Sequence, residues 1–224
     1  MKSSLPKALQ FLAGKPMLEH VKQATLLLKA DQMIVVCSPG AQERIQKTNN
    51  SSGEGVTCVQ QEEALGTGHA LKCALSKINQ DNVVLVLLGD APLVQPSTLQ
   101  KLVASASKNS LALLTANIAN PKGYGRIVRN TDNEIIAILE EDECTEKQRN
   151  IKEVNSGIMA FPPNRIGQWL ERLSANNKKG EYYLTDVIGL ASEDGTFIDS
   201  VKPQTTEEIF GVNDKTQLAE AEKH

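Results

Sequence analysis

Three uninterrupted apolar runs constrain the fold of this chain more than any other feature. They occupy residues 33–37, 83–88 and 111–114, and the first two end at Ser-Pro-Gly and at Gly-Asp. Runs without polar alternation are typical of strands buried on both faces, as in a parallel sheet covered by helices. With 224 residues, the chain is long enough to enclose one such core.

Amphipathic segments separate the apolar runs. Apolar side chains recur at three- and four-residue steps over residues 17–28 and 70–78, which predicts two helices. A third helix is expected to start near Pro96, where Ser97 or a neighbouring residue can cap it. This alternation of strands and helices predicts an α/β fold with a doubly wound, Rossmann-like sheet.

The pattern changes between about residues 120 and 160. Residues 126–129 and 134–139 each contain adjacent β-branched apolar residues and are joined through Thr-Asp-Asn, which predicts a hairpin. We therefore expect a mixed sheet that carries a small antiparallel lobe. Because the chain has no low-complexity linker and no internal repeat, residues 1–224 are interpreted as a single domain.

Charge and cysteine content narrow the function classes. The 24 Lys and Arg residues nearly balance 27 Asp and Glu residues, and the net charge of -3 provides no field to gather nucleic acid or a membrane surface. No apolar run approaches the ~20 residues needed to span a bilayer. The four cysteines lack Cys-x-x-Cys spacing, so free thiols and a cytoplasmic location are expected.

The first segment with chemical potential covers residues 60–70 and contains Leu-Gly-Thr-Gly-His. It follows a predicted strand at 56–59 and leads into a predicted helix. Glycines at such a position let the backbone approach a ligand, and the helix N-terminus favours an anion. An ordinary glycine turn is the alternative, and the short motif alone favours that alternative.

A second segment, Gly89-Asp90, follows the apolar run 83–88. Ligands of open α/β sheets bind beyond the carboxyl ends of the strands. A carboxylate there suits Mg²⁺, which is often held by one or two protein oxygens together with substrate phosphates. The alternative is that Asp90 only caps the following turn.

Further candidates are weaker when each is taken alone. The amide of Asn155 is able both to donate to and to accept from sugar hydroxyls. Helix capping is a sufficient explanation for Thr185 or for Asn213. The acidic run 140–143 is interpreted as a solvated loop, with Glu140 as the exception. No Ser-His-Asp order and no clustered histidines indicate a hydrolase or a zinc enzyme.

Taken together, these segments resemble the sugar-nucleotide pyrophosphorylase half of the bifunctional N-acetylglucosamine-1-phosphate uridyltransferase family. The resemblance extends over nearly the whole chain. It rests on eight motifs: Leu5-Pro6-Lys7, Leu12-Ala13-Gly14-Lys15-Pro16-Met17, Leu65-Gly66-Thr67-Gly68-His69-Ala70, Gly89-Asp90-Ala91-Pro92-Leu93, Gly123-Tyr124-Gly125-Arg126-Ile127, Glu153-Val154-Asn155-Ser156-Gly157, Glu181-Tyr182-Tyr183-Leu184-Thr185-Asp186 and Gly211-Val212-Asn213.

The resemblance implies a nucleotidyltransferase fold and a reaction. UTP and N-acetylglucosamine 1-phosphate would give UDP-N-acetylglucosamine and pyrophosphate, with Mg²⁺ as the cofactor. Asp90 and Asn213 would hold the metal, and Lys7 would place its ammonium against phosphate oxygens. Lys7 and Asp90 are thus the implied catalytic residues, and they also contact substrate. Gly89 and Asn213 are implied to contact substrate too.

The remaining implied substrate contacts fall into two sets. The uridine set consists of Gln61, Gly66 and Thr67. The set for the sugar and its N-acetyl group consists of Gly125, Glu140, Asn155 and Thr185, so that the antiparallel lobe would bind the sugar.

The sequence also departs from the family pattern. The family's first buried strand and Gly-rich loop precede the position at which Met1 stands, so the sheet is expected to lack its first strand. An internal methionine as the given start would explain this, and the coding DNA would test it. The family's C-terminal β-helix is missing as well, so neither acetyl transfer nor the family trimer is expected. Leu88 replaces a tyrosine, and Asp142 replaces a frequent lysine.

Two alternative functions stay open at this stage. One is a sugar-nucleotide-binding module without turnover, which is favoured because the family's Gly-rich loop carries a basic side chain that this sequence lacks. The other is a related nucleotidyltransferase that uses a different sugar 1-phosphate. A nicotinamide dehydrogenase is disfavoured, because no Gly-x-Gly-x-x-Gly follows the first strand.

Overall fold

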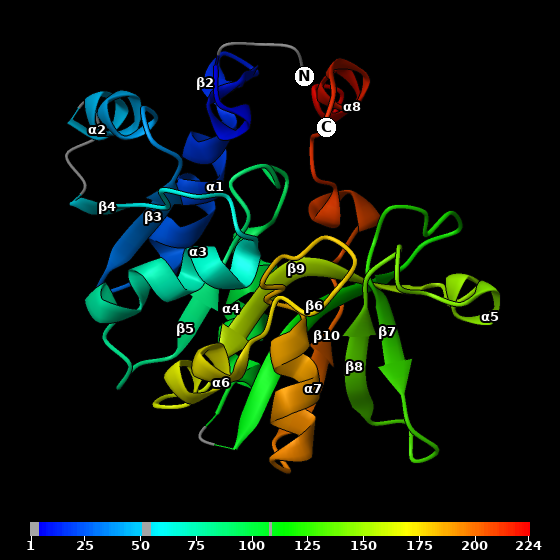
Figure 1. Ribbon diagram of the computed structural model, residues 1–224. Helices are drawn as coiled ribbons and strands as arrows, with labels where there is room; N and C mark the ends of the chain where they lie inside the picture. Colours follow the sequence, from blue (N-terminus) through cyan, green and yellow to red (C-terminus); the bar gives the residue numbers. More distant parts are fainter. Residues whose placement is uncertain (1–4, 51–54, 108) are drawn as a thin grey trace.

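A computed structural model describes residues 5–50, 55–107 and 109–224, and a six-stranded mixed sheet forms its centre (Figure 1). Five strands follow one another across this sheet, and the sixth strand, β5, pairs with β9. In spatial order they are β10 (Phe197–Val201), β6 (Ser110–Asn117), β9 (Glu153–Phe161), β7 (Arg126–Arg129) and β8 (Ile135–Leu139), with β5 at Val84–Val86.

Strand β9 organises the two parts of this sheet. It runs antiparallel to β6 on one side. On its other side it pairs with β5 at residues 159–161 and with β7 at Val154. Between these two partners the register against β6 shifts, and Gly157 has φ +80°. The expected mixed sheet with an antiparallel hairpin, β7–β8, is thereby confirmed.

The strands β3 (Met33–Cys37) and β4 (Val56–Gln60) form a separate parallel pair. In Figure 1 they lie beside β5 at one end of the molecule. Within the described residues, no ladder joins β3 to β5. All five residues of β3 are only half-buried, although the run is apolar, whereas residues 111–116 of β6 are fully buried.

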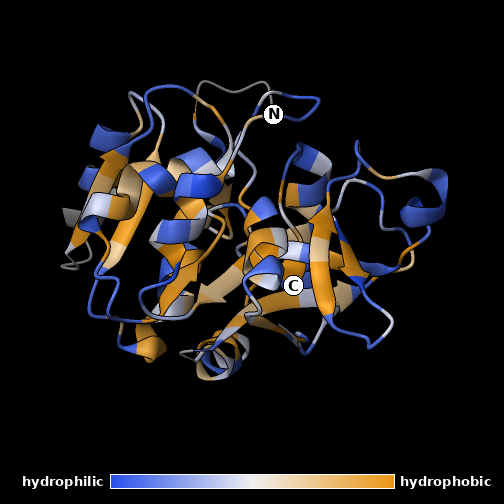
Figure 2. Ribbon diagram, turned by 60° about the horizontal axis from the view of Figure 1, so that its bottom comes forward, coloured by the Kyte–Doolittle hydropathy of each residue, from blue (hydrophilic) through white to orange (hydrophobic). Residues whose placement is uncertain are grey.

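Helices cover both faces of the central sheet. On one face Leu111 and Leu113 pack with Trp169 and with residues of α3, α6 and α7, while on the other Ala112 and Leu114 pack with residues of α4. Figure 2 shows hydrophobic colour concentrated on the strands and hydrophilic colour on loops and outer helix faces. The helix bounds are α1 Met17–Thr25, α2 Gln42–Asn50, α3 Thr67–Ala74, α4 Pro96–Ser105, α5 Glu146–Arg149, α6 Ile166–Arg172, α7 Asp186–Glu193 and α8 Lys215–Ala221. This two-sided packing confirms the doubly wound α/β prediction.

All three predicted helices are present, with one correction at a cap. The segment at 17–28 forms α1 and a 3₁₀ turn at Leu26–Leu28, and the segment at 70–78 forms most of α3 and a 3₁₀ turn at Leu75–Lys77. Helix α4 begins at Pro96, as predicted. Its N-cap is Gln95, without a side-chain cap hydrogen bond, so Ser97 does not cap it. Proline is favoured at the first helical position, because the N–H that it lacks would have no partner within the helix.

A charged network ties β9 to its neighbours. Glu153 accepts hydrogen bonds from Arg129 Nε at 2.8 Å and from Lys202 Nζ at 2.5 Å, and also from Thr115 Oγ1 at 2.9 Å. Burial raises the pKa of Glu153, but these hydrogen bonds outweigh it and lower the pKa to about 2. The carboxylate therefore stays charged and links β6, β7, β9 and the segment after β10.

Two further expectations concern cysteines and membranes. All four cysteines are free thiols, and burial raises the pKa of Cys37, Cys58 and Cys144. Among the described residues, no helix combines the length and apolar character that crossing a bilayer requires.

Candidate functional site

Three predicted site residues from distant parts of the chain meet in one cluster. Lys7 lies in the first 3₁₀ turn, at Lys7–Leu9, Asp90 follows β5, and Asn213 precedes α8. The Lys7 ammonium forms an ion pair with the Asp90 carboxylate and donates to Asn213 Oδ1 at 2.8 Å. We refer to Lys7, Asp90 and Asn213 as the cation corner.

Packing explains why these residues come together. Leu12 and Met17 near the start of the chain share an apolar cluster with Val212 and Ala221 near its end. The Val212 N–H donates to the Asp90 carbonyl at 2.8 Å, which fixes the last segment against the end of β5. The cation corner therefore depends on how the two ends of the chain dock.

Glycine at position 89 makes this docking possible. A Cβ at Gly89 would lie 3.1 Å from Ala8 Cβ, so the bare backbone lets the Lys7–Leu9 turn approach. The predicted role of Gly89 was substrate contact. Its observed contact is with the turn that carries Lys7.

The donor set of the cation corner suits a hard cation. It supplies one carboxylate and one amide oxygen, and an ammonium already lies between them. Among the described residues no group of three or more His, Cys, Asp or Glu could hold a metal ion. A magnesium ion at Asp90 and Asn213 would thus need oxygens from substrate phosphates, which is common for Mg²⁺.

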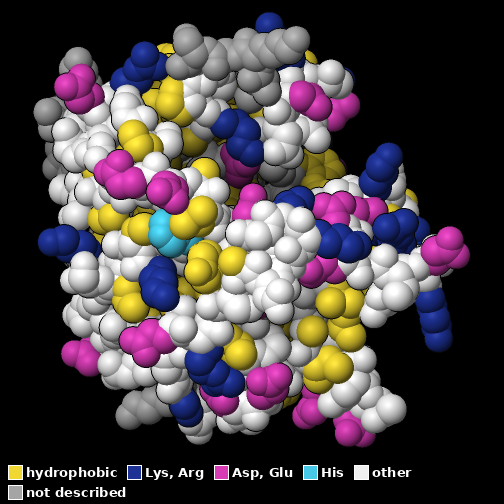
Figure 3. All heavy atoms as spheres, in the orientation of Figure 1, with side chains coloured by type: hydrophobic (Ala, Val, Ile, Leu, Met, Phe, Trp, Pro, Cys, Tyr) yellow, Lys and Arg dark blue, Asp and Glu magenta, His cyan; other side chains and the backbone are white. Residues whose placement is uncertain are grey.

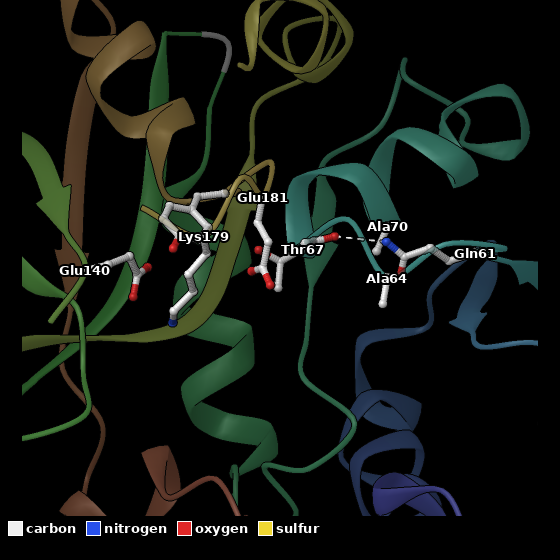
Figure 4. Close-up of a pocket in the computed structure, with 9 residues that line it drawn as sticks. Gln61, Ala64, Thr67, Ala70, Glu140, Lys179 and Glu181 are labelled. Carbon is white, nitrogen blue, oxygen red and sulfur yellow. Dashed lines mark hydrogen bonds between the residues drawn. The ribbon is translucent and has the colours of Figure 1, made fainter. Parts of the chain in front are cut away.

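A cavity of about 400 Å³ lies at the start of α3 (Figure 4). Figure 4 draws side chains from three parts of the chain around it: the segment before and within α3, the end of β8, and the loop before α7. The lining residues are Gln61, Ala64, Gly66, Thr67, Ala70, Glu140, Lys179, Glu181 and Tyr183. Four predicted site residues, Gln61, Gly66, Thr67 and Glu140, are thereby brought to one cavity.

The residues predicted for uridine are held by one another and by the loop before α7. Gln61 Nε2 donates to the Gly66 carbonyl at 3.0 Å, and Thr67 Oγ1 accepts from Leu184 N at 3.1 Å. A Cβ at Gly66, where φ is +101°, would lie only 2.6 Å from the Tyr182 carbonyl oxygen. Gly66 therefore serves the close approach of another protein segment, which neither sequence-based interpretation anticipated.

The residues predicted for the sugar gather around Glu140. Thr185 Oγ1 donates to Glu140 Oε1 at 2.9 Å. The Asn155 N–H donates to the Gly125 carbonyl at 2.9 Å, and Asn155 Oδ1 accepts from Gly157 N at 3.1 Å. These contacts place β7, β8, β9 and the start of α7 around one spot.

Capping does not account for Thr185 or Asn213. Thr185 is the N-cap of α7, but it makes no side-chain cap hydrogen bond and instead bonds Glu140. The N-cap of α8 is Asp214, which accepts from Gln217 N at 2.8 Å. Asp90 pairs with Lys7. The side chains of Thr185, Asp90 and Asn213 are thus each directed to another predicted site residue.

Two residues near Glu140, Arg126 and Asp186, were not predicted as site residues from the sequence. Arg126 is buried, and its guanidinium bonds Glu141 Oε2 at 2.6 Å, which lowers the pKa of Glu141 and anchors the residue beside Glu140. Burial and the nearby Glu143 and Glu140 raise the pKa of Asp186 to about 6. Arg126 and Asp186 each lie within one of the eight family motifs, and this membership was the only sequence feature that pointed to them.

The face of the molecule in Figure 3 mixes acidic and basic side chains, without a broad region of one sign. This agrees with the net charge of -3. Selectivity for an anionic substrate must therefore come from local groups such as those of the cation corner and the cavity.

Comparisons with known proteins identify a matching domain family and several relatives of this chain. Residues 1–151 match the MobA-like NTP transferase domain. Over 224 residues the chain is 41% identical to Bifunctional protein GlmU of Cellvibrio japonicus, and it is 44% identical over 227 residues to the protein of that name from Pseudomonas aeruginosa (strain LESB58). A third relative, from Acinetobacter baumannii (strain AYE), is 42% identical over 223 residues. Each match covers all of this chain and 48–49% of the relative, so the chain spans about half their length.

Proposed function

Because this chain belongs to the MobA-like NTP transferase domain family and is a nucleotidyltransferase, we propose that it transfers uridylyl groups from UTP to N-acetylglucosamine 1-phosphate. The products are UDP-N-acetylglucosamine and pyrophosphate. The cation corner, in which Lys7 contacts Asp90 and Asn213, is the observation that supports this proposal most directly. The motif resemblance supports the choice of substrates.

The reaction breaks one phosphoanhydride bond and forms another. A phosphate oxygen of the sugar phosphate attacks the α-phosphorus of UTP, and the bond from that phosphorus to the oxygen bridging to the β-phosphate breaks. The leaving pyrophosphate takes the bonding electron pair. Such a transfer depends on positioning and on neutralising charge rather than on a strong base.

The residues of the cation corner supply the charge. Lys7 places its ammonium against phosphate oxygens, since its exposed side chain can leave Asp90 for a stronger anion. Asp90 and Asn213 would hold a magnesium ion through their oxygens, and such an ion would supply neutralisation of the phosphate charge.

The cavity residues orient the substrates. Gln61, Gly66 and Thr67 bind the uridine end. The Gly66 carbonyl holds Gln61, the Tyr182 carbonyl lies close to Gly66, and the Leu184 N–H holds Thr67. Glu140 and Thr185, joined by a 2.9 Å hydrogen bond, bind sugar hydroxyls together with Asn155 and Gly125.

Pyrophosphate release tests the proposal. The chain is incubated with UTP, N-acetylglucosamine 1-phosphate and Mg²⁺, and Asp90→Ala is the comparison variant. Release that requires both substrates and disappears in Asp90→Ala supports the proposed reaction. Saturable UDP-N-acetylglucosamine binding without release would instead identify a binding module.

A substrate panel tests the specificity. Glucose 1-phosphate and galactosamine-type sugar phosphates replace the acceptor, and other nucleoside triphosphates replace UTP. Faster turnover of another pair would assign the chain to a related sugar-1-phosphate nucleotidyltransferase.

A further inference from the structure

Among the described residues that line the cavity, Lys179 alone carries a positive charge. The other charged lining residues are Glu140 and Glu181. In Figure 4 the Lys179 side chain extends from the loop before α7 and lies, in this view, between Glu140 and Glu181, with Thr67 beyond Glu181. Glu140 belongs to the residues proposed for the sugar, and Thr67 to those proposed for the uridine. The diphosphate of a nucleotide sugar connects these two parts of the ligand.

The acidic residues of the cavity would repel a bound diphosphate unless a positive charge lay beside it. A diphosphate that entered the cavity would face the carboxylates of Glu140 and Glu181, and like charges in a partly enclosed site are unfavourable. The chain as a whole offers no compensating field, because its net charge is -3. An ammonium on the cavity wall offsets this repulsion locally.

Without ligand, Lys179 has a partner that is easily exchanged. Its ammonium lies 3.2 Å from Asp142 Oδ2, and the two side chains are 54% and 53% exposed. Exposed pairs of this kind contribute little to stability. The hydrogen bond to Asp142 raises the pKa of Lys179, so the group stays charged.

The backbone that carries Lys179 is anchored, so only its side chain has to move. Asn177 Oδ1 accepts from the N–H groups of Lys179 and Glu181, both at 3.2 Å. The next residue along, Tyr182, donates its N–H to the Leu65 carbonyl at 2.8 Å. The loop is therefore fixed to the segment that precedes α3, on the uridine side of the cavity.

We propose that Lys179 is a phosphate-binding residue of this cavity, whose ammonium exchanges Asp142 for the diphosphate of the bound uridine nucleotide. The inference rests on the proposed function and names an additional residue for it. At position 142, where the resemblance leads one to expect a lysine, the chain has an aspartate. The positive charge is then provided from the opposite loop, by the residue that pairs with this aspartate.

Affinities for three ligands test the inference. Uridine, UDP and UDP-N-acetylglucosamine are titrated in the presence of Mg²⁺ into the unaltered chain and into Lys179→Gln. The variant is expected to bind UDP and UDP-N-acetylglucosamine about fivefold more weakly, because it loses one exposed charge-assisted contact. Uridine, which has no phosphate, is expected to bind both proteins equally.

Two matched variants sharpen the result. Lys178→Gln removes the same charge from the adjacent residue, whose ammonium donates to the Asp142 carbonyl and does not line the cavity. It should leave UDP affinity unchanged. Asp142→Asn releases Lys179 from its partner, so UDP should bind as tightly as before or more tightly.

Different results would overturn the role of Lys179 and the proposed function. Unchanged UDP affinity in Lys179→Gln, an equal loss for uridine, or an equal loss in Lys178→Gln would each overturn the role of Lys179. Failure of the unaltered chain to bind UDP or UDP-N-acetylglucosamine would overturn the proposed function itself.

Discussion

Lys7 and Asp90 form an ion pair in which the ammonium occupies the position expected for a metal, because it also lies 2.8 Å from Asn213 Oδ1. In the proposed reaction, a divalent cation held by Asp90 and Asn213 would therefore compete with this ammonium for the same two oxygens. Nucleoside triphosphate would relieve the competition by drawing Lys7 toward its phosphates. Metal and nucleotide are thus expected to favour each other's binding.

This competition predicts the metal affinity of a variant. Without nucleotide, Lys7→Met should bind Mn²⁺, used as a spectroscopic substitute for Mg²⁺, about two- to fivefold more tightly, as expected from losing an exposed ion pair. Electron paramagnetic resonance of free Mn²⁺ provides the measurement. Lys101→Met, on the exposed side of α4, is the control. Unchanged or weaker binding by Lys7→Met would contradict the competition.

The network around Glu153 predicts a stability difference that depends on pH. Glu153→Gln leaves Arg129 and Lys202 without their anion, so the free energy of unfolding at pH 7 should fall by about 1.5–3 kcal/mol. The pKa of Glu153 lies at about 2, below its ordinary 4.5. The stabilisation is therefore complete above pH 4.5 and decreases as the pH falls toward 2.

Urea unfolding between pH 2 and pH 7 checks this dependence. Glu171→Gln, at an exposed position of α6, is the control and should change stability little. A loss in Glu153→Gln that stays constant down to pH 2 would show that packing, and not charge, is responsible.

The opposite sign is expected for Asp186. Its pKa is raised from 3.8 to about 6, first by burial and then by Glu143 and Glu140. The charged carboxylate therefore costs stability as the pH rises through this window. Asp186→Asn should be more stable than the unaltered chain at pH 7.5, by about 1 kcal/mol after allowance for solvent screening, and this advantage should disappear below pH 3.8.

Thermal or urea unfolding at pH 3.5 and pH 7.5 measures the effect. Asp132→Asn, in the exposed hairpin turn, serves as the comparison. If Asp186→Asn is less stable than the unaltered chain at pH 7.5, the benefit of a carboxylate in the first turn of α7 outweighs its burial.

A pair of glycine substitutions separates backbone strain from close packing. Gly66 and Gly40 both have positive φ, but a Cβ at Gly66 would meet the Tyr182 carbonyl oxygen at 2.6 Å, whereas a Cβ at Gly40 would meet no described atom within 4 Å beyond its chain neighbours. Gly40→Ala should thus cost only the strain, about 1 kcal/mol. Gly66→Ala should cost a further ~1–3 kcal/mol, because the loop before α7 must shift.

Urea unfolding compares the two variants, and uridine titration reports on the cavity. Gly66→Ala should weaken uridine binding, and Gly40→Ala should leave it unchanged. Equal losses of stability would show that the contact between Gly66 and Tyr182 relaxes without cost.

Local sequence patterns predicted much of this fold. The apolar runs at 33–37 and 111–114 form β3 and the core of β6, and the alternate burial of Leu111 and Ala112 on opposite faces explains why the run lacks polar residues. The hairpin β7–β8 follows from its turn, where Asn133 has φ +65°. Such features depend on neighbours in sequence.

Contacts between distant segments could not be predicted from local sequence patterns. The division of one β9 edge between β5 and β7 depends on long-range pairing, to which no local pattern points. The docking of Tyr182 on Gly66 likewise joins segments from opposite halves of the chain. Lys179 lies outside every motif, so its place on the cavity wall became visible only in three dimensions.

The shared edge of β9 has a consequence for the proposed alignment of the two substrates. Strand β5 ends four residues before Asp90, β7 begins directly after Gly125, and both strands pair with β9. The distance between the proposed metal-binding residues and the proposed sugar-binding residues is thereby set largely by hydrogen-bonded backbone. Loop substitutions would consequently alter which sugar is accepted, while the proposed line of attack on the phosphorus would keep its geometry.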